Sequence, residues 1–310
     1  MKEYPNIFQM ARAPFFTALL SPLVFGTLLA CHVDGRFEVI NFLLMLVIGI
    51  GLHTATNVYN DIYDTEQGAD EVNVHRNEFS GGSGILVRYP ELTAKMYMLA
   101  RAGLILSLLG TIALTFFVDR SQWPMLWALF FVSAFLSKYY TAAPVKLAYR
   151  GLGEIAVLFS FGPMAMMLAY VSQNTDLCSV MITAMPIGGL STVTILLMGE
   201  LIDLPADKQA GKLGIAPRLG SKATAAIYAA AQAAIVLNVI AVAVQLEGYG
   251  WPLFAALLPY VVIFPRIIIV LKSHHNDPQE LMVIAKANVQ LHLLFSLLLN
   301  LSMLLISMLW

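Results

Sequence analysis

Long runs of apolar residues, separated by short polar stretches, dominate the chain. Nine of these runs are long enough to cross the hydrocarbon core of a bilayer, which takes about 20 residues of helix. The pattern predicts helices at about 14–32, 39–60, 96–118, 122–139, 153–172, 178–200, 221–246, 250–272 and 286–309. The fourth of these is the shortest. We therefore expect an all-α integral membrane protein with nine transmembrane helices.

The distribution of positive charge tests this count, because Lys and Arg concentrate in cytoplasmic loops. With the N-terminus in the cytoplasm, nine helices leave all but Arg36 and Arg120 of the 18 Lys and Arg residues on the cytoplasmic side. A wrong number of helices would instead have distributed the Lys and Arg residues over both sides of the membrane. The same topology predicts an outer C-terminus and three long cytoplasmic loops, at 61–95, 137–152 and 201–221.

Similar acidic stretches follow the second and sixth predicted helices, which suggests an internal duplication. We expect residues 1–310 to form a single transmembrane domain around a central cavity. Helices one to four, about 14–139, and helices five to eight, about 153–272, would be the two repeats. The ninth helix, about 286–309, would be added to them.

Composition agrees with a membrane protein. Hydrophobic residues make up 59% of the chain and charged residues only 12%, whereas soluble domains carry about 25% charged residues. The lipid bilayer is therefore the expected environment, and a net charge of −1 gives no indication of nucleic acid as a partner. Cys31 and Cys178 fall at predicted outer helix ends, where a disulfide is one reading and two apolar thiols the favoured one.

The first acidic stretch carries Asn57, Asp61 and Asp64 at positions i, i+4 and i+7, so the three share one helical face. His53 extends this face one turn deeper. Carboxylates at a membrane edge are costly and tend to be functional. Hard divalent cations such as Mg²⁺ prefer oxygen ligands and hold phosphates. Acids solvated by water are the alternative reading, but two matched stretches favour a metal site.

The second acidic stretch places Glu200, Asp203 and Asp207 at i, i+3 and i+7. Pro205 disfavours helix at Leu204, so we expect Asp207 to lie on a turn and not on the shared face.

Basic residues in the loops could neutralise a phosphate, although each could equally be a marker of the cytoplasmic side. They are Lys212, Arg218, Arg76, Arg88, Lys146 and Arg150. The glycine-rich segment 79–84 could present backbone N–H groups to phosphate oxygens or act as a hinge. Tyr139 and Tyr140 could face a carbocation with their rings or belong to the interfacial aromatic belt.

Together these motifs resemble those of a known family. The first stretch, Asn57-x-x-Asn60-Asp61-x-x-Asp64-x-x-x-Gly68-x-Asp70, resembles the first aspartate-rich motif of the UbiA superfamily of intramembrane prenyltransferases. The second, Asp203-x-x-x-Asp207-x-x-x-Gly211-Lys212, resembles its second motif. Tyr140-Thr-x-x-Pro144 and Tyr149-Arg-Gly-Leu-Gly-Glu154 look like the middle loop of the branch that prenylates 1,4-dihydroxy-2-naphthoate.

Two departures from that branch concern the second motif. Its usual Asn/Arg-rich lead-in is here Gly199-Glu200-Leu-Ile202, and the usual Arg-Thr after Lys212 is Leu213-Gly214. Both put the identity of the acceptor in question more than the diphosphate chemistry.

The resemblance implies Mg²⁺-dependent transfer of an isoprenyl chain from its diphosphate to an aromatic small-molecule acceptor. Dihydroxynaphthoate, as in menaquinone biosynthesis, would be that acceptor. Asn57, Asp61 and Asp64 would serve one metal, and Asp203 and Asp207 a second. Lys212, Arg218, Arg76 and Lys146 would bind diphosphate, while His53, Tyr139 and Tyr140 would lie on the acceptor and carbocation side. Glu154 would cap or brace the middle loop.

By the same resemblance, the protein would lie in a bacterial inner membrane with its active site facing the cytoplasm. Another aromatic acceptor and terpene cyclisation are alternatives within the superfamily. A membrane transporter is the alternative from a different class, although transporters place their ionisable groups nearer the membrane midplane.

Overall fold

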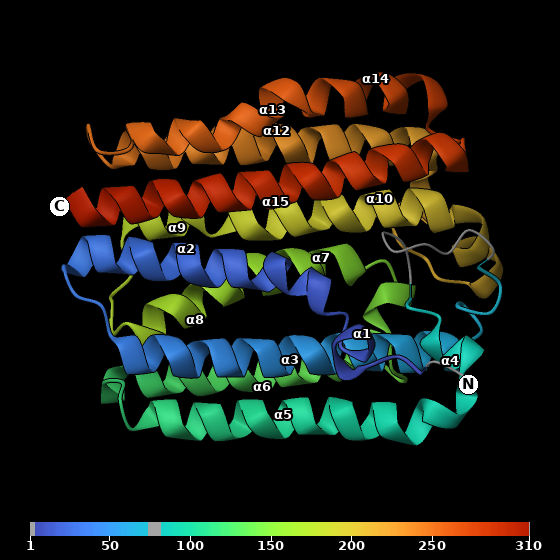
Figure 1. Ribbon diagram of the computed structural model, residues 1–310, viewed down its shortest axis with the longest axis horizontal. Helices are drawn as coiled ribbons and strands as arrows, with labels where there is room; N and C mark the ends of the chain where they lie inside the picture. The colour runs from blue at the N-terminus through green and yellow to red at the C-terminus, as the bar shows by residue number, and fades with distance from the viewer. Residues whose placement is uncertain (1–3, 74–81, 310) are drawn as a thin grey trace.

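The computed structural model describes residues 4–73 and 82–309, and all regular elements within them are helices (Figure 1). The α-helices are α1 (Ile7–Met10), α2 (Phe16–Asp34), α3 (Val39–Glu66), α4 (Ile85–Arg88), α5 (Thr93–Thr115), α6 (Trp123–Tyr139), α7 (Gly153–Phe159), α8 (Ala165–Ser172), α9 (Ser179–Ala184), α10 (Pro186–Ala210), α11 (Ile215–Leu219), α12 (Ser221–Gln245), α13 (Leu258–Val262), α14 (Phe264–His274) and α15 (Pro278–Leu309). Shorter helical turns are η1 (Ala13–Phe15), η2 (Pro90–Leu92), η3 (Arg120–Gln122), η4 (Leu147–Tyr149), η5 (Ser160–Met164) and η6 (Trp251–Leu257).

Eight helical stretches in the described ranges are long and apolar enough to cross a membrane, so the chain is an integral membrane protein. They are Ala13–Asp34, Val39–Glu66, Pro90–Thr115, Gly153–Ser172, Ser179–Ala210, Ser221–Gln245, Trp251–His274 and Pro278–Leu309. The fourth predicted crossing corresponds to α6, which has 17 residues and is not among the eight. The total of nine crossings, the cytoplasmic N-terminus and the duplication stay predictions.

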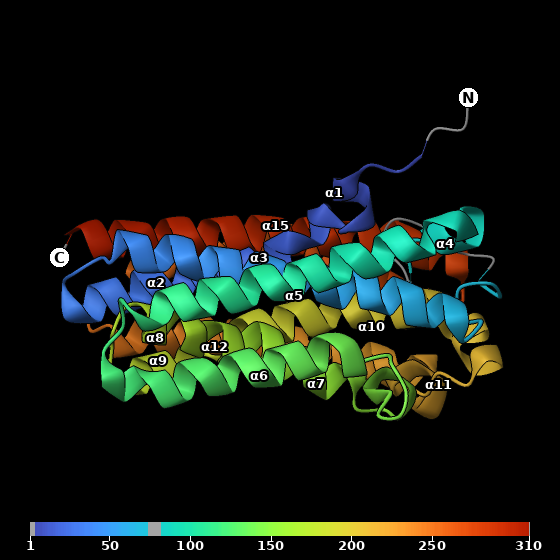
Figure 2. The same ribbon diagram turned by 90° about the horizontal axis from the view of Figure 1, so that it is seen from below.

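The long helices run nearly parallel to one another in a layered bundle (Figures 1 and 2). The C-terminal ends of α3 and α10 meet at the same end of this bundle, together with the short helices α4 and α11. The C-terminal end of α15 lies at the opposite end. Both acidic stretches therefore share one end of the bundle, as the sequence predicted.

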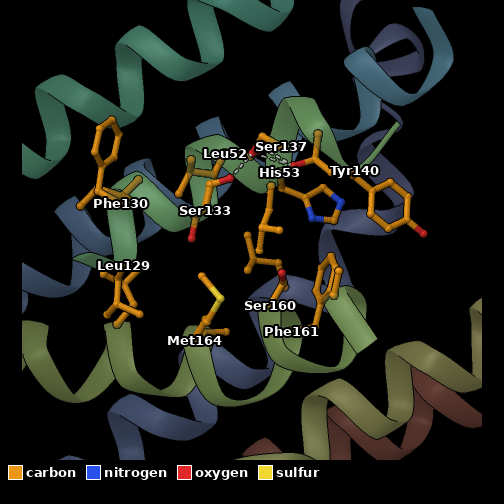
Figure 3. A pocket seen from close by; sticks show the side chains of 18 of the residues that line it. Leu52, His53, Leu129, Phe130, Ser133, Ser137, Tyr140, Ser160, Phe161 and Met164 are labelled. Carbon is orange, nitrogen blue, oxygen red and sulfur yellow. Dashed lines mark hydrogen bonds between the residues drawn. The ribbon is translucent and has the colours of Figure 1, made fainter. Parts of the chain in front are cut away.

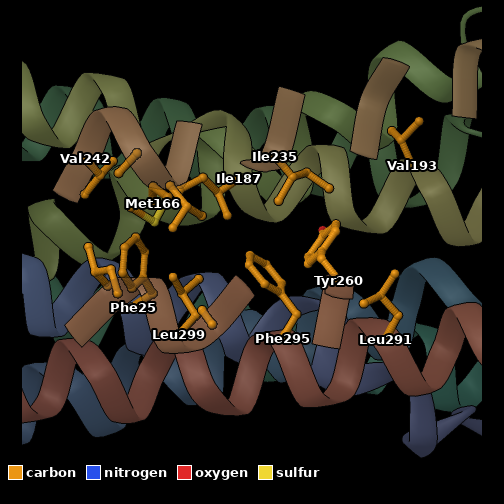
Figure 4. Close-up of a cluster of buried hydrophobic side chains, with 14 of the residues drawn as sticks. Phe25, Met166, Ile187, Val193, Ile235, Val242, Tyr260, Leu291, Phe295 and Leu299 are labelled. Atoms are coloured by element: carbon orange, nitrogen blue, oxygen red, sulfur yellow. The ribbon is translucent and has the colours of Figure 1, made fainter. Parts of the chain in front are cut away.

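The largest buried cluster fills the space between α2, α8, α10, α12 and α15 (Figure 4). Phe25, Ile235 and Phe295 are among its fully enclosed side chains. A chain of buried polar groups crosses the same half of the bundle: Tyr260 donates to Gln232 over 2.9 Å, and Tyr228 donates to Asn288 over 2.8 Å. Because these polar groups are paired, their burial does not weaken the helix packing.

The helices α3 and α5 approach closely through small residues. A Cβ atom on Gly103 would lie 2.6 Å from the carbonyl oxygen of Gly51, and the Ser107 hydroxyl donates to the Ile48 carbonyl over 2.9 Å. Small residues allow this kind of backbone contact between membrane helices. This contact holds α3, the helix that carries the first acidic stretch, close against α5.

The predicted helix at 153–172 is one crossing, but it is not a regular helix. A π-helical turn, η5, separates α7 from α8 and contains Pro163. Proline has no backbone N–H and disturbs the helical ladder, and π-helical turns often occur at functional sites. Here the turn places Phe161 and Met164 on the wall of a cavity.

Two sequence-based boundaries were wrong. The helix α3 continues to Glu66, past the predicted end at 60, so the long loop begins later than expected, while Asp61 and Asp64 lie on the helix as their spacing predicted. The helix α10 continues through Pro205 to Ala210, so the expectation that Asp207 lies on a turn was also wrong. The helix α10 as a whole packs against α12, α15 and α7. Packing of this kind allows a membrane helix to tolerate the backbone hydrogen bond that a proline removes. Cys31 and Cys178 are free thiols.

Candidate active site

A polar cavity of about 190 Å³ lies between the C-terminal halves of α3 and α10. Its wall combines carboxylates, amides and cations with apolar side chains. The polar and charged members are Arg12, His53, Asn57, Asn60, Tyr140, Glu154, Thr192, Glu200, Asp203, Asp207 and Lys212. The helical face predicted for His53 and Asn57 therefore opens onto the second acidic stretch.

Asp61, one turn beyond Asn57 on α3, is almost completely buried, with 1% of its surface exposed, and is not among the residues that line this cavity. Its Oδ1 accepts a hydrogen bond from the backbone N–H of Ser83 at 2.9 Å, and the Arg12 Nη1 atom lies 3.7 Å away. Within the described residues its Oδ2 has no hydrogen-bond partner. A buried carboxylate oxygen without a partner is costly, and it is well suited to a bound cation.

Asp64 joins the first acidic stretch to the loop after the second. Its Oδ1 accepts from the Tyr149 hydroxyl at 2.7 Å, and its Oδ2 lies 3.0 Å from the Lys212 ammonium. Burial, and then the Asp64 charge, raise the pKa of Tyr149 above its ordinary value. Tyr149 is therefore a neutral hydrogen-bond donor, and Asp64 lies between two donors.

Lys212 reaches Asp64 because of how α10 ends. Gly211 has φ +69°, a left-handed conformation that glycine adopts without strain, and the Lys212 N–H donates to the Asp207 carbonyl at 2.8 Å. Burial by itself lowers the pKa of Lys212, but the carboxylates of Asp64 and Asp207 outweigh burial and raise that pKa well above its usual value. The ammonium is therefore a permanent positive charge in the polar cavity.

The second acidic stretch also contacts the segment that follows the first. Asp203 Oδ1 accepts from the side-chain amide of Asn73 at 2.9 Å. Asp203 and Asp207 are both buried, and both lie on the cavity wall. Since α10 is helical at both positions, one turn apart, the two carboxylates stand on the same side of the helix.

Two further carboxyl groups brace the loop that carries Lys212. Glu154 Oε1 accepts from the Ile215 N–H, and Glu200 Oε2 accepts from the Ala216 N–H at 3.0 Å. Glu154 thus supports the start of α11, and not the middle loop that the sequence suggested.

An apolar cavity of about 200 Å³ adjoins the polar one, between α3, α6 and the α7–α8 crossing (Figure 3). Leu52, Leu126, Leu129, Phe130 and Met164 form part of its wall. Three hydroxyl groups on the wall, those of Thr56, Thr111 and Ser137, bond to each other or to the backbone, for example Thr56 to Ser137 at 2.9 Å. This cavity suits a hydrocarbon chain.

The two cavities share His53, Asn57, Asn60, Tyr140, Val157 and Phe161. His53 lies here with its ring edge-on to Phe16 and Phe161, with centroids 5.2 and 5.4 Å away (Figure 3). Burial raises the pKa of the Tyr140 phenol, so this group stays neutral. A molecule with a charged head and an apolar tail could therefore extend through this junction.

Other residues singled out from the sequence have different surroundings. Tyr139 stacks near Phe135, with centroids 4.8 Å apart, and lines neither of these two cavities. The Arg218 guanidinium donates to the carbonyls of Leu213 and Arg150 at 2.9 and 2.6 Å, so it braces two loops. The Lys146 ammonium lies 5.5 Å from the Tyr149 ring centroid.

Arg76 and residues 79–81 of the glycine-rich segment lie outside the described ranges. The sequence did not indicate that Arg12 belongs to the site. It also gave no role to Asn60. Only the fold shows that Arg12 approaches Asp61 across 49 positions of sequence.

Within residues 4–73 and 82–309, no group of three His, Cys, Asp or Glu side chains is close enough to hold a metal ion by itself. The donor set nevertheless fits Mg²⁺, which usually takes one or two carboxylates and completes its shell with water and substrate phosphate. The unpartnered Asp61 Oδ2 is the specific feature that favours such an ion.

Comparison with known proteins links these cavities to a family of enzymes. The UbiA prenyltransferase family profile matches residues 19–298. A 2-carboxy-1,4-naphthoquinone phytyltransferase from Synechocystis is 27% identical over 87% of this chain and 83% of its own length. A 1,4-dihydroxy-2-naphthoate octaprenyltransferase from Bacillus subtilis is 25% identical over 96% of this chain and 92% of its own.

The fold is also similar to that of a solved UbiA homologue from Archaeoglobus fulgidus, whose structure was determined with dimethylallyl diphosphate (DMAPP) and Mg²⁺ bound. The TM-score is 0.54 at 13% sequence identity, covering 95% of this chain and 99% of the other. At this identity the likeness concerns the fold.

Proposed function

The chain belongs to the UbiA prenyltransferase family, and on that premise we propose that the polar cavity binds the diphosphate of an isoprenyl diphosphate while the apolar cavity receives its hydrocarbon chain. The protein is a membrane prenyltransferase. The observation that carries the proposal is the junction at Asn57, Asn60 and Tyr140, which lies on both walls. It places a charged, oxygen-rich compartment next to an apolar one of similar volume.

In this proposal Asn57, Asp61 and Asp64 hold one Mg²⁺ and Asp203 and Asp207 hold a second. The unpartnered Oδ2 of Asp61 supports the first assignment. When bound, these ions neutralise the negative charge that develops on the leaving diphosphate. The similarity to a fold solved with Mg²⁺ and an isoprenyl diphosphate also supports divalent metal dependence.

Lys212 is the cation of this chain that stabilises the leaving group most directly. Its ammonium lies on the polar cavity wall, and its charge is secured by Asp64 and Asp207. Fixed positive charge placed where negative charge develops is usually the largest catalytic contribution. Arg12, beside Asp61, adds a second cation, while Arg218 and Lys146 act by holding the loops around it. Arg76 stays a candidate diphosphate ligand outside the described ranges.

Ionisation breaks the bond between the first carbon of the chain and the diphosphate oxygen, and leaves an allylic cation at the junction of the cavities. The rings of Tyr140 and Phe161 flank this position and can stabilise the cation through their faces. The apolar wall excludes water that would otherwise capture it. An electron-rich aromatic ring then attacks the cation, and a proton or carbon dioxide leaves that ring. In this proposal His53 contacts the acceptor.

The acceptor of this proposal is 1,4-dihydroxy-2-naphthoate, as in menaquinone biosynthesis. Two relatives that match most of the chain support this choice. One is a 2-carboxy-1,4-naphthoquinone phytyltransferase and the other a 1,4-dihydroxy-2-naphthoate octaprenyltransferase. The proposed location is a bacterial inner membrane with the polar cavity facing the cytoplasm, which agrees with the distribution of Lys and Arg in the sequence.

The test is to incubate the purified protein in lipid nanodiscs with geranylgeranyl diphosphate, Mg²⁺ and a panel of aromatic acceptors. Mass spectrometry of the extracted lipids identifies the product, and released diphosphate is measured in parallel. We expect prenylated naphthalenediol and metal-dependent diphosphate release. Diphosphate release without any prenylated aromatic product would contradict the proposed acceptor class. No turnover of any isoprenyl diphosphate would contradict the proposed function itself.

A further inference from the structure

An arginine lies on the outer, lipid-facing surface of α5. This helix forms one edge of the bundle, with α3 packed on its inner side (Figure 1). Its exposed face carries Arg101 between Met98 and Ile105, which lie about one turn away on either side and are both more than half exposed. Arg101 is therefore part of an otherwise apolar stripe on a membrane-spanning helix.

The sequence of α5 and the turn after it indicates the depth of Arg101 in the bilayer. Residues 102–118 carry no charged side chain. At about 1.5 Å of helix per residue, they cover most of the roughly 30 Å hydrocarbon core. Asp119 and Arg120 end this uncharged run at its far side. Arg101 therefore lies at the other edge of the core, nearest the acidic stretches, where the lipid headgroups begin.

Within residues 4–73 and 82–309, the protein supplies no carboxylate that forms an ion pair with Arg101. The guanidinium packs instead against Tyr97, with its Cζ 5.7 Å from the ring centroid. A charged side chain on a lipid-facing surface is costly unless it is paired or reaches the headgroups. The anion available at this depth is a lipid phosphate, which a guanidinium binds through paired hydrogen bonds.

A carboxylate follows Arg101 along the same surface. The Tyr97 hydroxyl donates to Glu66 Oε1 over 2.8 Å, so Tyr97 contacts both Arg101 and Glu66. Glu66 is exposed and is the last residue of α3. Tyr97 lies one turn closer than Arg101 to the start of α5, so Glu66 lies further from the hydrocarbon core than Arg101 does. Going outward from the core, the surface presents first a guanidinium and then a carboxylate.

Tyrosine rings surround the carboxylate. The Tyr63 ring stacks on Tyr59 with centroids 5.9 Å apart, and it stands edge-on to Tyr97 at 6.3 Å. Tyrosine is enriched at membrane interfaces, and aromatic rings attract ammonium groups through their faces. The surface therefore offers an anion site and, further out, a cation site with aromatic walls.

We propose that this surface binds the headgroup of a phospholipid that carries a primary ammonium, namely phosphatidylethanolamine. Arg101 holds the phosphate, and Glu66 accepts a hydrogen bond from the ammonium, which lies against the rings of Tyr63 and Tyr97. The order of the two protein charges, outward from the core, matches the order of phosphate and ammonium in this lipid. The headgroup bridges α3 and α5, because Glu66 belongs to one helix and Arg101 to the other.

The surroundings of the site fit the rest of the lipid. Deeper along α5, Ile105 and Leu109 are exposed and provide an apolar track for an acyl chain. The turns of α3 that the headgroup clamps also carry Asp61 and Asp64, which are buried on the other side of the helix. The inference depends on the membrane location of the chain and not on the proposed function.

The experiment measures how single lipids bind to the purified, delipidated chain in detergent, by native mass spectrometry. Phosphatidylethanolamine, phosphatidylcholine and phosphatidylglycerol are compared with identical acyl chains. Phosphatidylcholine keeps the positive charge but has no N–H donor, and phosphatidylglycerol has no positive charge. We expect the first phosphatidylethanolamine to bind about three- to tenfold more tightly than either, the size of one charge-assisted hydrogen bond near the surface.

Four variants make the result specific. Glu66→Gln keeps an oxygen that accepts from Tyr97, yet it should remove the preference for phosphatidylethanolamine and leave phosphatidylglycerol binding within about twofold. Arg101→Gln should weaken the first binding of all three lipids about three- to tenfold, and Arg101→Lys should recover part of this loss. Arg120→Gln removes an exposed arginine beside Trp123, at the other end of α5, and should leave the preference unchanged.

Equal affinity of the unsubstituted chain for the three lipids would overturn the proposal, because Arg101 would then only reach into the headgroup layer. Tighter binding of phosphatidylglycerol would overturn it as well. A preference for phosphatidylethanolamine that survives Glu66→Gln would show that the ammonium is bound elsewhere. Since Glu66 and Arg101 are both exposed, we expect the helical circular dichroism of these variants to match that of the unsubstituted chain.

Discussion

The ammonium of Lys212 lies 3.0 Å from Oδ2 of Asp64, so a cation from the loop after the second acidic stretch is held by a carboxylate of the first. Asp64 also accepts from Tyr149 of the middle loop. Three segments that are far apart in the sequence therefore meet at one carboxylate. This contact joins the first acidic stretch to the loop that follows the second.

Replacing Lys212 tests whether its charge serves catalysis. We expect Lys212→Met to lower kcat/KM for prenyl transfer by about 100- to 1,000-fold, because fixed positive charge no longer faces the leaving diphosphate. Lys222→Met, which removes an exposed lysine nearby in sequence on α12, is the matched control and should retain activity. Diphosphate release under single-turnover conditions is the measurement. Normal release by the Lys212 variant would refute this role.

The carboxylates of both stretches should be needed in their charged form. Asp61→Asn and Asp203→Asn keep the side-chain shape, yet we expect each to lower turnover at least about 100-fold, because a neutral amide binds Mg²⁺ poorly. Helical circular dichroism should be unchanged. Asp119→Asn, between α5 and α6, serves as the control with unaltered activity. If either variant keeps its activity at saturating Mg²⁺, the two-stretch model is wrong.

Removal of divalent metal should have the same effect as those variants. We expect chelation with EDTA to abolish diphosphate release, and added Mg²⁺ to restore it, because Lys212 and Arg12 alone neutralise only part of the diphosphate charge. Isothermal titration of Mg²⁺ with and without a non-hydrolysable isoprenyl diphosphate gives a second readout. Binding should be tighter with the analogue, since phosphate oxygens complete the coordination shell. Turnover that persists in EDTA would exclude this mechanism.

Glu154 and Glu200, which brace the loop that carries Lys212, leave little room for a side chain at Gly214. A Cβ atom on Gly214 would lie 2.7 Å from Glu200 Oε1 and 2.9 Å from Glu154 Oε1. We expect Gly214→Ala to displace α11 and lower both the apparent melting temperature and kcat. Glu200→Gln should be tolerated, because an amide oxygen still accepts from the Ala216 N–H, whereas Glu200→Ala should cost about 1–3 kcal/mol for the stranded N–H group. Equal stability of the Gln and Ala variants would contradict the bracing role.

The apolar cavity should limit the donor chain. Leu129 of α6 lies on its wall and is 8% exposed. We expect Leu129→Trp to lower kcat/KM for geranylgeranyl diphosphate at least about tenfold more than for dimethylallyl diphosphate, because added bulk blocks distal isoprene units and not the first. The ratio of the two values is the measurement. A ratio that does not change would indicate that the chain lies elsewhere.

Hydrophobicity alone predicted the crossing helices well, because apolar runs of bilayer length have few other stable forms. It failed at the ends of α3 and α10. Both helices continue into polar sequence, where backbone hydrogen bonds and neighbouring helices sustain them and hydropathy carries no signal. The shared face of Asn57, Asp61 and Asp64 followed from helical spacing and needed no structure.

The contacts between segments could not be predicted in this way. The approach of Arg12 to Asp61 and the hydrogen bond from Asn73 to Asp203 depend on how distant segments pack. Local pattern says nothing about such pairs. The same limit explains why Glu154 was placed with the middle loop, when its partner is Ile215.

The close approach of Gly51 and Gly103 has a consequence for how the enzyme can change over evolutionary time. Any side chain at position 103 would push α5 away from α3, and α3 carries Asp61 and Asp64 at its far end. Gly103, which is remote from every reacting atom, therefore influences where the carboxylates of Asp61 and Asp64 lie. The packing of α3 against α5 therefore restricts which substitutions the enzyme tolerates, even at positions that line neither the polar nor the apolar cavity.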